Sequence, residues 1–187
     1  MRGEVEKLHS QRDLNGQRLE VLSRLHGLIV EALPDGRNLD GAFLKSRAWV
    51  VGPVADQPDF GDCERIVAAA SAAAVHELAV ASVELGKPTE LELVPLESAA
   101  LVLALRDGHR SLTNLVVVSW PLELLVFKDA ADFYLICAET ERVEDMLGRS
   151  LHDAWTAFEA EAEARAGNSR YFDLRPIARS YRSVGGR

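Results

Sequence analysis

Hydrophobic residues near the start of the chain recur at three- and four-residue steps, which is the period of an α-helix. The pair Asn15-Gly16 disfavours a continuous helix at that point, so the pattern predicts a separate and more mobile N-terminal segment over residues 1–17. The Pro-Asp-Gly sequence that starts at Pro34 then predicts a turn. We therefore expect a helix over residues 18–33, with an apolar stripe formed by Leu19, Leu22, Leu25, Ile29 and Leu33.

Two short apolar stretches flank three polar residues within residues 41–52, which read GAFLKSRAWVVG. This arrangement predicts a β-hairpin or a single bent strand. A loop follows, and Asp62 is placed to cap the next helix.

The segment from Asp62 to Leu85 is rich in alanine, with eight alanines between Ala68 and Ala81. Alanine favours the helix, and a helix that is apolar nearly all round is expected to be buried. Gly86 and Pro88 are suited to end it. We expect this long helix either to lie between a sheet and another helix or to form a self-complementary contact between two copies. The interface candidates on it are Ala70, Ala73, Ala74 and Ala81.

Beyond the alanine-rich segment the hydrophobic period changes to two, which is typical of β-strands. Strands are predicted at residues 89–95, 99–108, 114–120, 122–129 and 132–139. Short connections between them favour an antiparallel meander. Thr140 is expected to cap a short helix that Gly148 ends, and Ser150 to begin a helix that runs to about Ala166.

Together these elements predict an α+β fold, in which an antiparallel sheet of about five to seven strands packs against the long alanine-rich helix. Flanking N- and C-terminal helices complete the expected arrangement. We expect a single domain over residues 18–167, followed by a basic C-terminal tail over residues 168–187.

The order of the predicted elements between about residues 19 and 120 resembles that of the Roadblock / dynein light chain fold. The segments that carry the resemblance are GAFLKSRAWVVG, CERIVAAASAAAVHELAVASVELG, TELELVPLES, AALVLALRDG and NLVVVSW. The resemblance implies a small non-catalytic module that dimerises and binds partners such as small GTPases. After Trp120 the chain departs from that pattern, with Pro121, a further predicted hairpin, two helices and the basic tail.

Charge is distributed unevenly along the 187 residues, whose formal net charge is −8. Residues 168–187 hold five arginines against the single acidic residue Asp173, whereas the rest of the chain is strongly acidic. An acidic body repels phosphate backbones, so nucleic acid binding is expected at most in the tail. We favour docking of the tail, on its own body or on a second subunit, because the preceding helix ends in several glutamates. The candidate contact residues are Arg175, Arg179 and Arg182.

No motif of a known catalytic, cofactor-binding or metal-binding site occurs in the sequence. Cys63 and Cys137 lie in or beside apolar runs and are expected to be buried. We therefore expect no catalytic residue, cofactor or metal site, no membrane contact and a cytoplasmic location. The predicted function is a protein-binding or regulatory module, expected to be dimeric. The alternatives are an immunity- or chaperone-like protein that masks a basic partner, and an enzyme with scattered pocket residues such as His109 and Cys137.

Overall fold

The computed structural model of the chain describes residues 2–84, 87–106, 113–130, 133–168 and 170–184, with side chains described from residue 16 on, Gln17 excepted. The described helices are α1 (Arg2–Ala32), α2 (Gly41–Ser46), α3 (Phe60–Ala72), α4 (Ser98–Arg106), α5 (Thr140–Leu147), α6 (Leu151–Arg165) and α7 (Arg175–Tyr181). The described strands are β1 (Val50–Val54), β2 (Glu77–Glu84), β3 (Lys87–Val94), β4 (Leu115–Trp120), β5 (Leu125–Asp129) and β6 (Phe133–Ala138).

The strands form one six-stranded sheet in the order β1-β6-β5-β4-β2-β3, and every pair of neighbours is antiparallel. The segments β4, β5 and β6 follow one another as a meander, and β2 and β3 form a hairpin. The chain therefore has the α+β fold that the sequence predicts.

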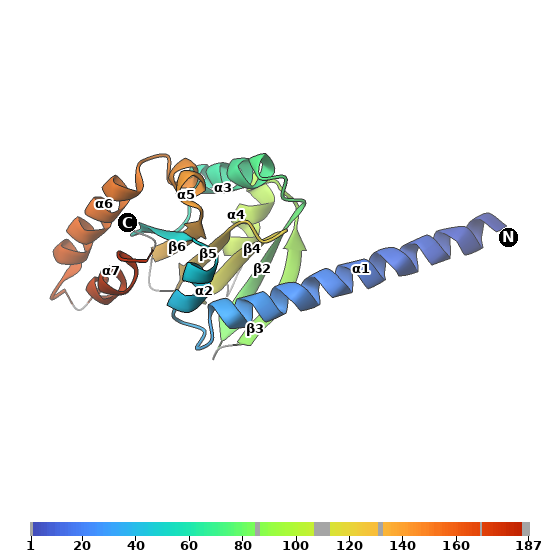
Figure 1. The fold of residues 1–187 in the computed structure, drawn as a ribbon, viewed down its shortest axis with the longest axis horizontal. Helices are drawn as coiled ribbons and strands as arrows, with labels where there is room; N and C mark the ends of the chain where they lie inside the picture. Colours follow the sequence, from blue (N-terminus) through green and yellow to red (C-terminus); the bar gives the residue numbers. More distant parts are fainter. Residues whose placement is uncertain (1, 85–86, 107–112, 131–132, 169, 185–187) are drawn as a thin grey trace.

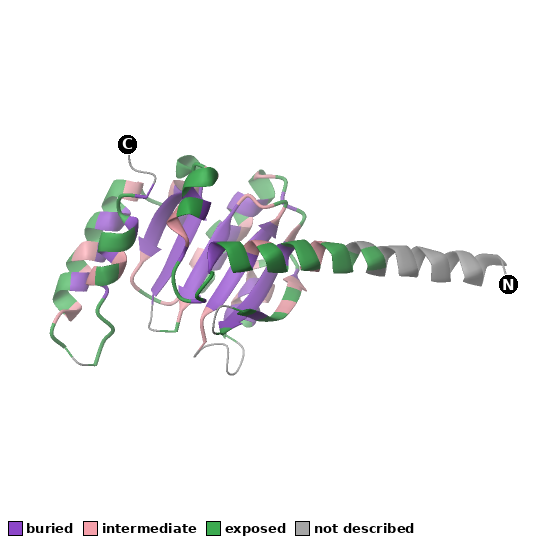
Figure 2. Cartoon of the chain, turned by 60° about the horizontal axis from the view of Figure 1, so that its bottom comes forward, coloured by how far each residue is buried: buried purple, intermediate pink, exposed green. Residues whose placement is uncertain are grey.

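Helices cover both faces of the sheet (Figure 1). On one face, side chains from α1, α2, α6 and α7 pack on alternate residues of the strands, such as Val116 and Phe127. On the other face, α3, α4 and α5 pack on the intervening residues, such as Val117 and Val126. Figure 2 shows the result as a nearly continuous buried sheet between helices with exposed outer faces. Apolar burial on both faces explains why the strand sequences are almost uniformly hydrophobic.

The long alanine-rich helix predicted from Asp62 to Leu85 is wrong in its second half. Helix α3 ends at Ala72, and Ala74 takes a left-handed backbone conformation with φ of 54°. The chain then forms β2, which pairs with β3 on one side and β4 on the other. Hydrogen bonding on both sides and complete burial of the Ala79–Ala81 stretch outweigh the helix propensity of alanine. Gly86, the predicted end of the helix, lies outside the described residues.

Helix α3 also begins earlier than predicted, because its N-cap is Asp59. The carboxylate of Asp59 accepts a hydrogen bond from the backbone N–H of Asp62, at 2.8 Å, and the carboxylate of Asp62 accepts one from the N–H of Asp59, at 2.9 Å. This reciprocal capping box satisfies two backbone donors at once. Asp62 therefore contributes to the cap from inside the helix.

Two further predictions were wrong in the opposite sense, because helices form where strands were predicted. The first half of residues 41–52 forms α2, whose N-cap Asp40 accepts a hydrogen bond from the Phe43 N–H at 2.7 Å; only β1 is extended. The predicted strand at residues 99–108 is instead α4, which buries Leu101, Ala104 and Leu105. These three residues stand at helical spacing, so they face the sheet together.

The remaining elements confirm the predictions within a few residues. Strands β3 to β6, the helix that Gly148 ends in a left-handed conformation, and the helix capped by Ser150 are all present. The prediction that Thr140 caps the first of these helices is wrong, because its N-cap is Glu139 and Thr140 is its first residue. Helix α1 differs in that Asn15-Gly16 does not interrupt it. Among its described side chains, buried ones begin at Leu25, and α1 extends well beyond the sheet in Figure 1.

The two outer strands of the sheet have different features at their edges. Strand β1 includes Pro53 and lies against α5 and α6. Strand β3 pairs with β2 through an irregular register between Val80 and Ser82, and it carries Lys87, Pro88 and alternating glutamates. Within the alanine-rich region, the N-terminal half forms α3, which packs on one face of the sheet, and the C-terminal half forms β2, which lies within the sheet.

Candidate functional site

Of the three arginines predicted as contact residues, Arg175 and Arg179 lie on α7 and Arg182 is its C-cap, at spacing i, i+4 and i+7. The opposite side of α7 is anchored in the core by Leu174 and Tyr181, which are 0% and 4% exposed. The hydroxyl of Tyr181 accepts a hydrogen bond from the backbone N–H of Leu39, at 2.8 Å, and burial raises the pKa of Tyr181 to about 12. The tail therefore docks on its own body, in a fixed orientation.

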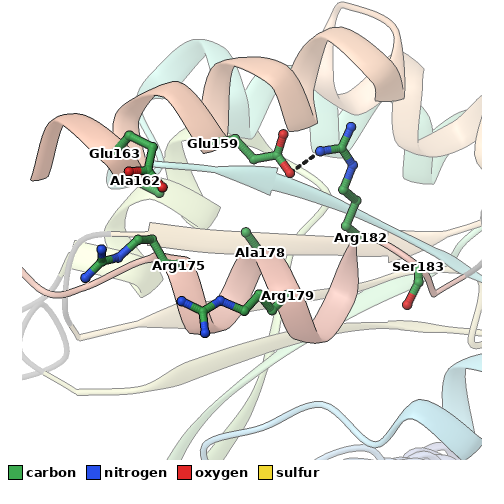
Figure 3. Close-up of a pocket in the computed structure, with 8 residues that line it drawn as sticks. All are labelled: Glu159, Ala162, Glu163, Arg175, Ala178, Arg179, Arg182 and Ser183. Atoms are coloured by element: carbon green, nitrogen blue, oxygen red, sulfur yellow. Dashed lines mark hydrogen bonds and ion pairs between the residues drawn. The ribbon is translucent and has the colours of Figure 1, made fainter. Parts of the chain in front are cut away.

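The outer side of α7 and the facing side of α6 enclose a groove with a volume of about 750 Å³ (Figure 3). Its base is formed by Ala162 of α6 and Ala178 of α7, whose small side chains leave space between the two helices. The charged groups that line it are Glu159, Glu163, Arg175, Arg179 and Arg182. A volume of this size lies in the range of small-molecule sites, roughly 300–1,000 Å³.

Two ion pairs fix part of this lining. Arg182 pairs with Glu159 across the groove, which is the pairing between tail and acidic helix that the charge pattern predicts. Arg175 donates two hydrogen bonds to the carboxylate of Asp173, at 2.9 and 2.8 Å. These hydrogen bonds hold the pKa of Asp173 at about 2, well below its ordinary value.

The other two charged side chains of the groove have no such partner. Within the residues that the structure describes, neither the carboxylate of Glu163 nor the guanidinium of Arg179 forms a hydrogen bond or an ion pair. Each lies close enough to a charged neighbour to act on it at longer range, Glu163 on Arg175 and Arg179 on Asp173. Glu163 is on α6 and Arg179 on α7, so the two opposite charges lie on facing walls. In Figure 3 the guanidinium groups of Arg175 and Arg179 extend toward the same end of the groove, away from Arg182.

The aromatic residues of the tail also contact their own chain. Tyr181 is buried, the ring of Phe172 stacks on Phe133 at 6.1 Å, and the guanidinium of Arg165 lies 5.5 Å from the ring centre of Tyr171. Each of these three rings therefore has a partner within the chain, although Tyr171 and Phe172 stay partly exposed.

The four alanine candidates do not share one surface. Ala70 in α3 and Ala81 in β2 are both 0% exposed and contribute to the core, whereas Ala73 is half-buried and Ala74 is exposed. The continuous small-residue face that was predicted is absent, because the helix ends before Ala73.

A second surface feature lies where α1 leaves the sheet. Leu19 is 67% exposed there, and a hollow of about 210 Å³ is lined by Glu20, Val21, Arg24 and Trp120. Arg24 bonds to Glu20 at 2.6 Å and lies 5.9 Å from the ring centre of Trp120. Leu19 belongs to the apolar stripe that the sequence predicts for this helix.

A buried polar cluster at the start of α3 was missed by the sequence analysis. Lys128 and Tyr134 are 2% and 1% exposed, and they lie opposite each other on β5 and β6. The hydroxyl of Tyr134 hydrogen-bonds to the carboxylate of Asp62, and burial is the main cause that raises the pKa of this tyrosine. The sequence predicted a strand at residues 122–129 but gave no sign that Lys128 would be buried.

Both cysteines are buried, as the sequence predicts, and neither forms a disulfide. Burial raises the pKa of Cys63 to about 12 and also raises that of Cys137. Neither thiol is therefore a thiolate nucleophile near neutral pH. His109, the suggested catalytic partner of Cys137, lies outside the described residues.

Within the described ranges, no three His, Cys, Asp or Glu side chains are grouped so that they could hold a metal ion. Across the same ranges, no helix combines the length and the apolar character needed to cross a bilayer.

No family model, no curated protein and no solved structure matches the chain. The resemblance to the Roadblock / dynein light chain fold therefore stays a prediction.

Proposed function

We propose that the chain is a non-enzymatic protein-binding module that associates with a second copy of itself along α1. The observation that supports this function is the contrast within α1, a 31-residue helix whose buried side chains, among those described, are confined to Leu25, Ile29 and Ala32. At about 1.5 Å per residue, the helix is about 46 Å long. Most of that length lies before Leu25, the first buried residue among those whose side chains are described.

A helix without tertiary contacts gains little stability in water, because helices in proteins are stabilised mainly by packing of an apolar face. The exposed side chain of Leu19, and the half-buried side chains of Val21 and Leu22 beside it, supply apolar surface where α1 leaves the body. Packing of a second chain there would bury this surface. The tryptophan and arginine of the adjoining hollow are residue types enriched in binding hot spots.

Charge favours a second copy as the partner on this surface. Residues 2–24 hold five basic and four acidic side chains, so two such segments can approach each other without net repulsion. Residues 25–167 hold eleven basic against 24 acidic side chains, so two copies meeting through that part would repel each other. Self-association is therefore best accommodated along α1.

The test compares two leucines that are equally exposed on different helices, Leu19 at 67% on α1 and Leu103 at 69% on α4. Light scattering coupled to size exclusion, over a dilution series, measures the mass of the full chain and of the Leu19→Glu and Leu103→Glu variants. We expect a dimer for the parent and for Leu103→Glu, and a dissociation constant at least about tenfold higher for Leu19→Glu, since a charge is placed in an apolar contact.

A parent chain that stays monomeric at all concentrations would overturn the proposal. So would equal effects of the two substitutions, because they would show that the contact does not lie on α1. Circular dichroism of each variant confirms that the fold is retained, as expected for substitutions at exposed positions.

A further inference from the structure

The groove between α6 and α7 holds one unpaired charge of each sign. We propose that it binds a zwitterionic small molecule, an amino acid or short peptide, whose carboxylate pairs with Arg179 and whose ammonium group pairs with Glu163. The apolar part of the ligand lies over Ala162 and Ala178. This inference is independent of the proposed association along α1.

The groove is already organised before a ligand arrives. Helix α7 is held by the buried side chains of Leu174 and Tyr181, and the ion pair between Arg182 and Glu159 joins its second half to α6. The Asp173 carboxylate occupies the guanidinium of Arg175 through two hydrogen bonds. Binding therefore requires little ordering of the walls, which lowers its entropic cost.

The pattern of pairing indicates a ligand with both charges. A simple anion on Arg179 would meet the negative Glu163 on the facing wall. A simple cation on Glu163 would meet the positive Arg179. A zwitterion satisfies both walls at once, and guanidinium–carboxylate pairing is directional as well as charge-assisted.

The base of the groove sets the size of the ligand's apolar part. Ala162 and Ala178 are only 2% and 8% exposed, so their methyl groups close the groove without filling it. A volume of about 750 Å³ leaves room for a dipeptide.

The test uses the dipeptide alanyl-leucine and two blocked forms of it, titrated into the full chain and followed by NMR. The N-acetyl form lacks the ammonium group, and the C-terminal amide lacks the carboxylate. We expect shifts in the amide resonances of residues along α6 and α7, with an affinity in the millimolar range because both pairing groups are exposed. Each blocked form is expected to bind about tenfold more weakly.

Substitutions on each wall identify the two contacts separately. Arg179→Gln is expected to reduce the affinity for the dipeptide about tenfold and to leave the affinity for the amide form unchanged. Glu163→Gln is likewise expected to reduce the affinity for the dipeptide about tenfold and to leave that for the acetylated form unchanged. Arg170→Gln is the matched control, since Arg170 is an exposed arginine before α7 that does not line the groove.

Three results would overturn the proposal. The first is that the dipeptide leaves the resonances of α6 and α7 unshifted. The second is that the acetylated form binds as tightly as the parent dipeptide, which would identify a site for anions alone. The third result is equal binding by the Arg179→Gln and Arg170→Gln variants. Measuring the mass of the same samples separates these outcomes from any change in self-association.

Discussion

The two ends of the chain are both helical, but they are held in opposite ways. The seven-residue α7 is fixed by Leu174, Ala178 and Tyr181, all of which are at most 8% exposed, and by an ion pair to α6. Among the described side chains of the 31-residue α1, the buried ones lie only in its last part, from Leu25 on. The length of a helix therefore says little about how firmly it is anchored. What differs is how much apolar surface each helix has already buried within its own chain.

The largest effect is expected from removing one end at a time. Deleting residues 168–187 uncovers the core positions now filled by Leu174, Tyr181 and Val184, and loss of a buried aromatic side chain alone costs about 3–5 kcal/mol. Deleting residues 1–17 removes none of the described core. Thermal unfolding should show a large fall in melting temperature for the first deletion and a small one for the second. Similar falls for both deletions would remove the contrast between the ends.

A smaller effect is expected within α1, from two leucines six residues apart. Leu25 is fully buried and Leu19 is 67% exposed. Leu25→Ala should lower the free energy of unfolding by about 3 kcal/mol, and Leu19→Ala should change it by less than about 0.5 kcal/mol when measured on the dissociated chain. Urea unfolding at low protein concentration measures both. A loss at Leu19 as large as that at Leu25 would show that anchoring of α1 begins earlier.

The smallest effect concerns pH at the start of α7. The hydrogen bonds from Arg175 lower the pKa of Asp173 to about 2, so the contact is fully formed above its ordinary pKa of 3.8 and is lost as the pH falls through about 2. Because Asp173 is fully exposed, its effect on overall stability is expected to be small. An NMR titration of the Asp173 carboxyl carbon should have its midpoint near 2, and Arg175→Gln should raise that midpoint. A midpoint near 4 in the parent would contradict the paired geometry.

Sequence patterns correctly predicted the strands whose residues strongly favour extended structure. Leu115–Trp120 holds three consecutive valines and a tryptophan, and the neighbouring strands are bounded by turn-forming residues, so local preference and final structure agree. The docking of the tail was also predictable, because five arginines follow a helix rich in glutamate. The structure confirms that pairing through Arg182 and Glu159.

The errors arose where local preference and tertiary context disagree. Ala79 and Ala81 favour a helix, but they lie in a strand with hydrogen-bonded neighbours on both sides. In the opposite sense, residues 98–106 can be read with either period, and packing of Leu101 and Leu105 on the sheet selects the helix. Short apolar segments do not carry enough information to choose between these outcomes.

The groove itself could not be predicted from sequence. Its charged residues were recognised individually, but its space depends on two alanines, Ala162 and Ala178, that come from different helices. Only the packing of α7 against α6 brings these methyl groups together. The buried Lys128 was missed for the same reason, since its cover comes from elements distant in sequence.

The irregular, charged edge strand β3 also limits how copies of the chain can assemble. A flat, uncharged outer strand would offer its backbone to a strand of a neighbour, and that step could repeat without end. Lys87, Pro88 and the altered register of β3 oppose such addition, and Pro53 with the covering helices does so at β1. Growth into fibrils by strand addition is thus discouraged at both borders of the sheet.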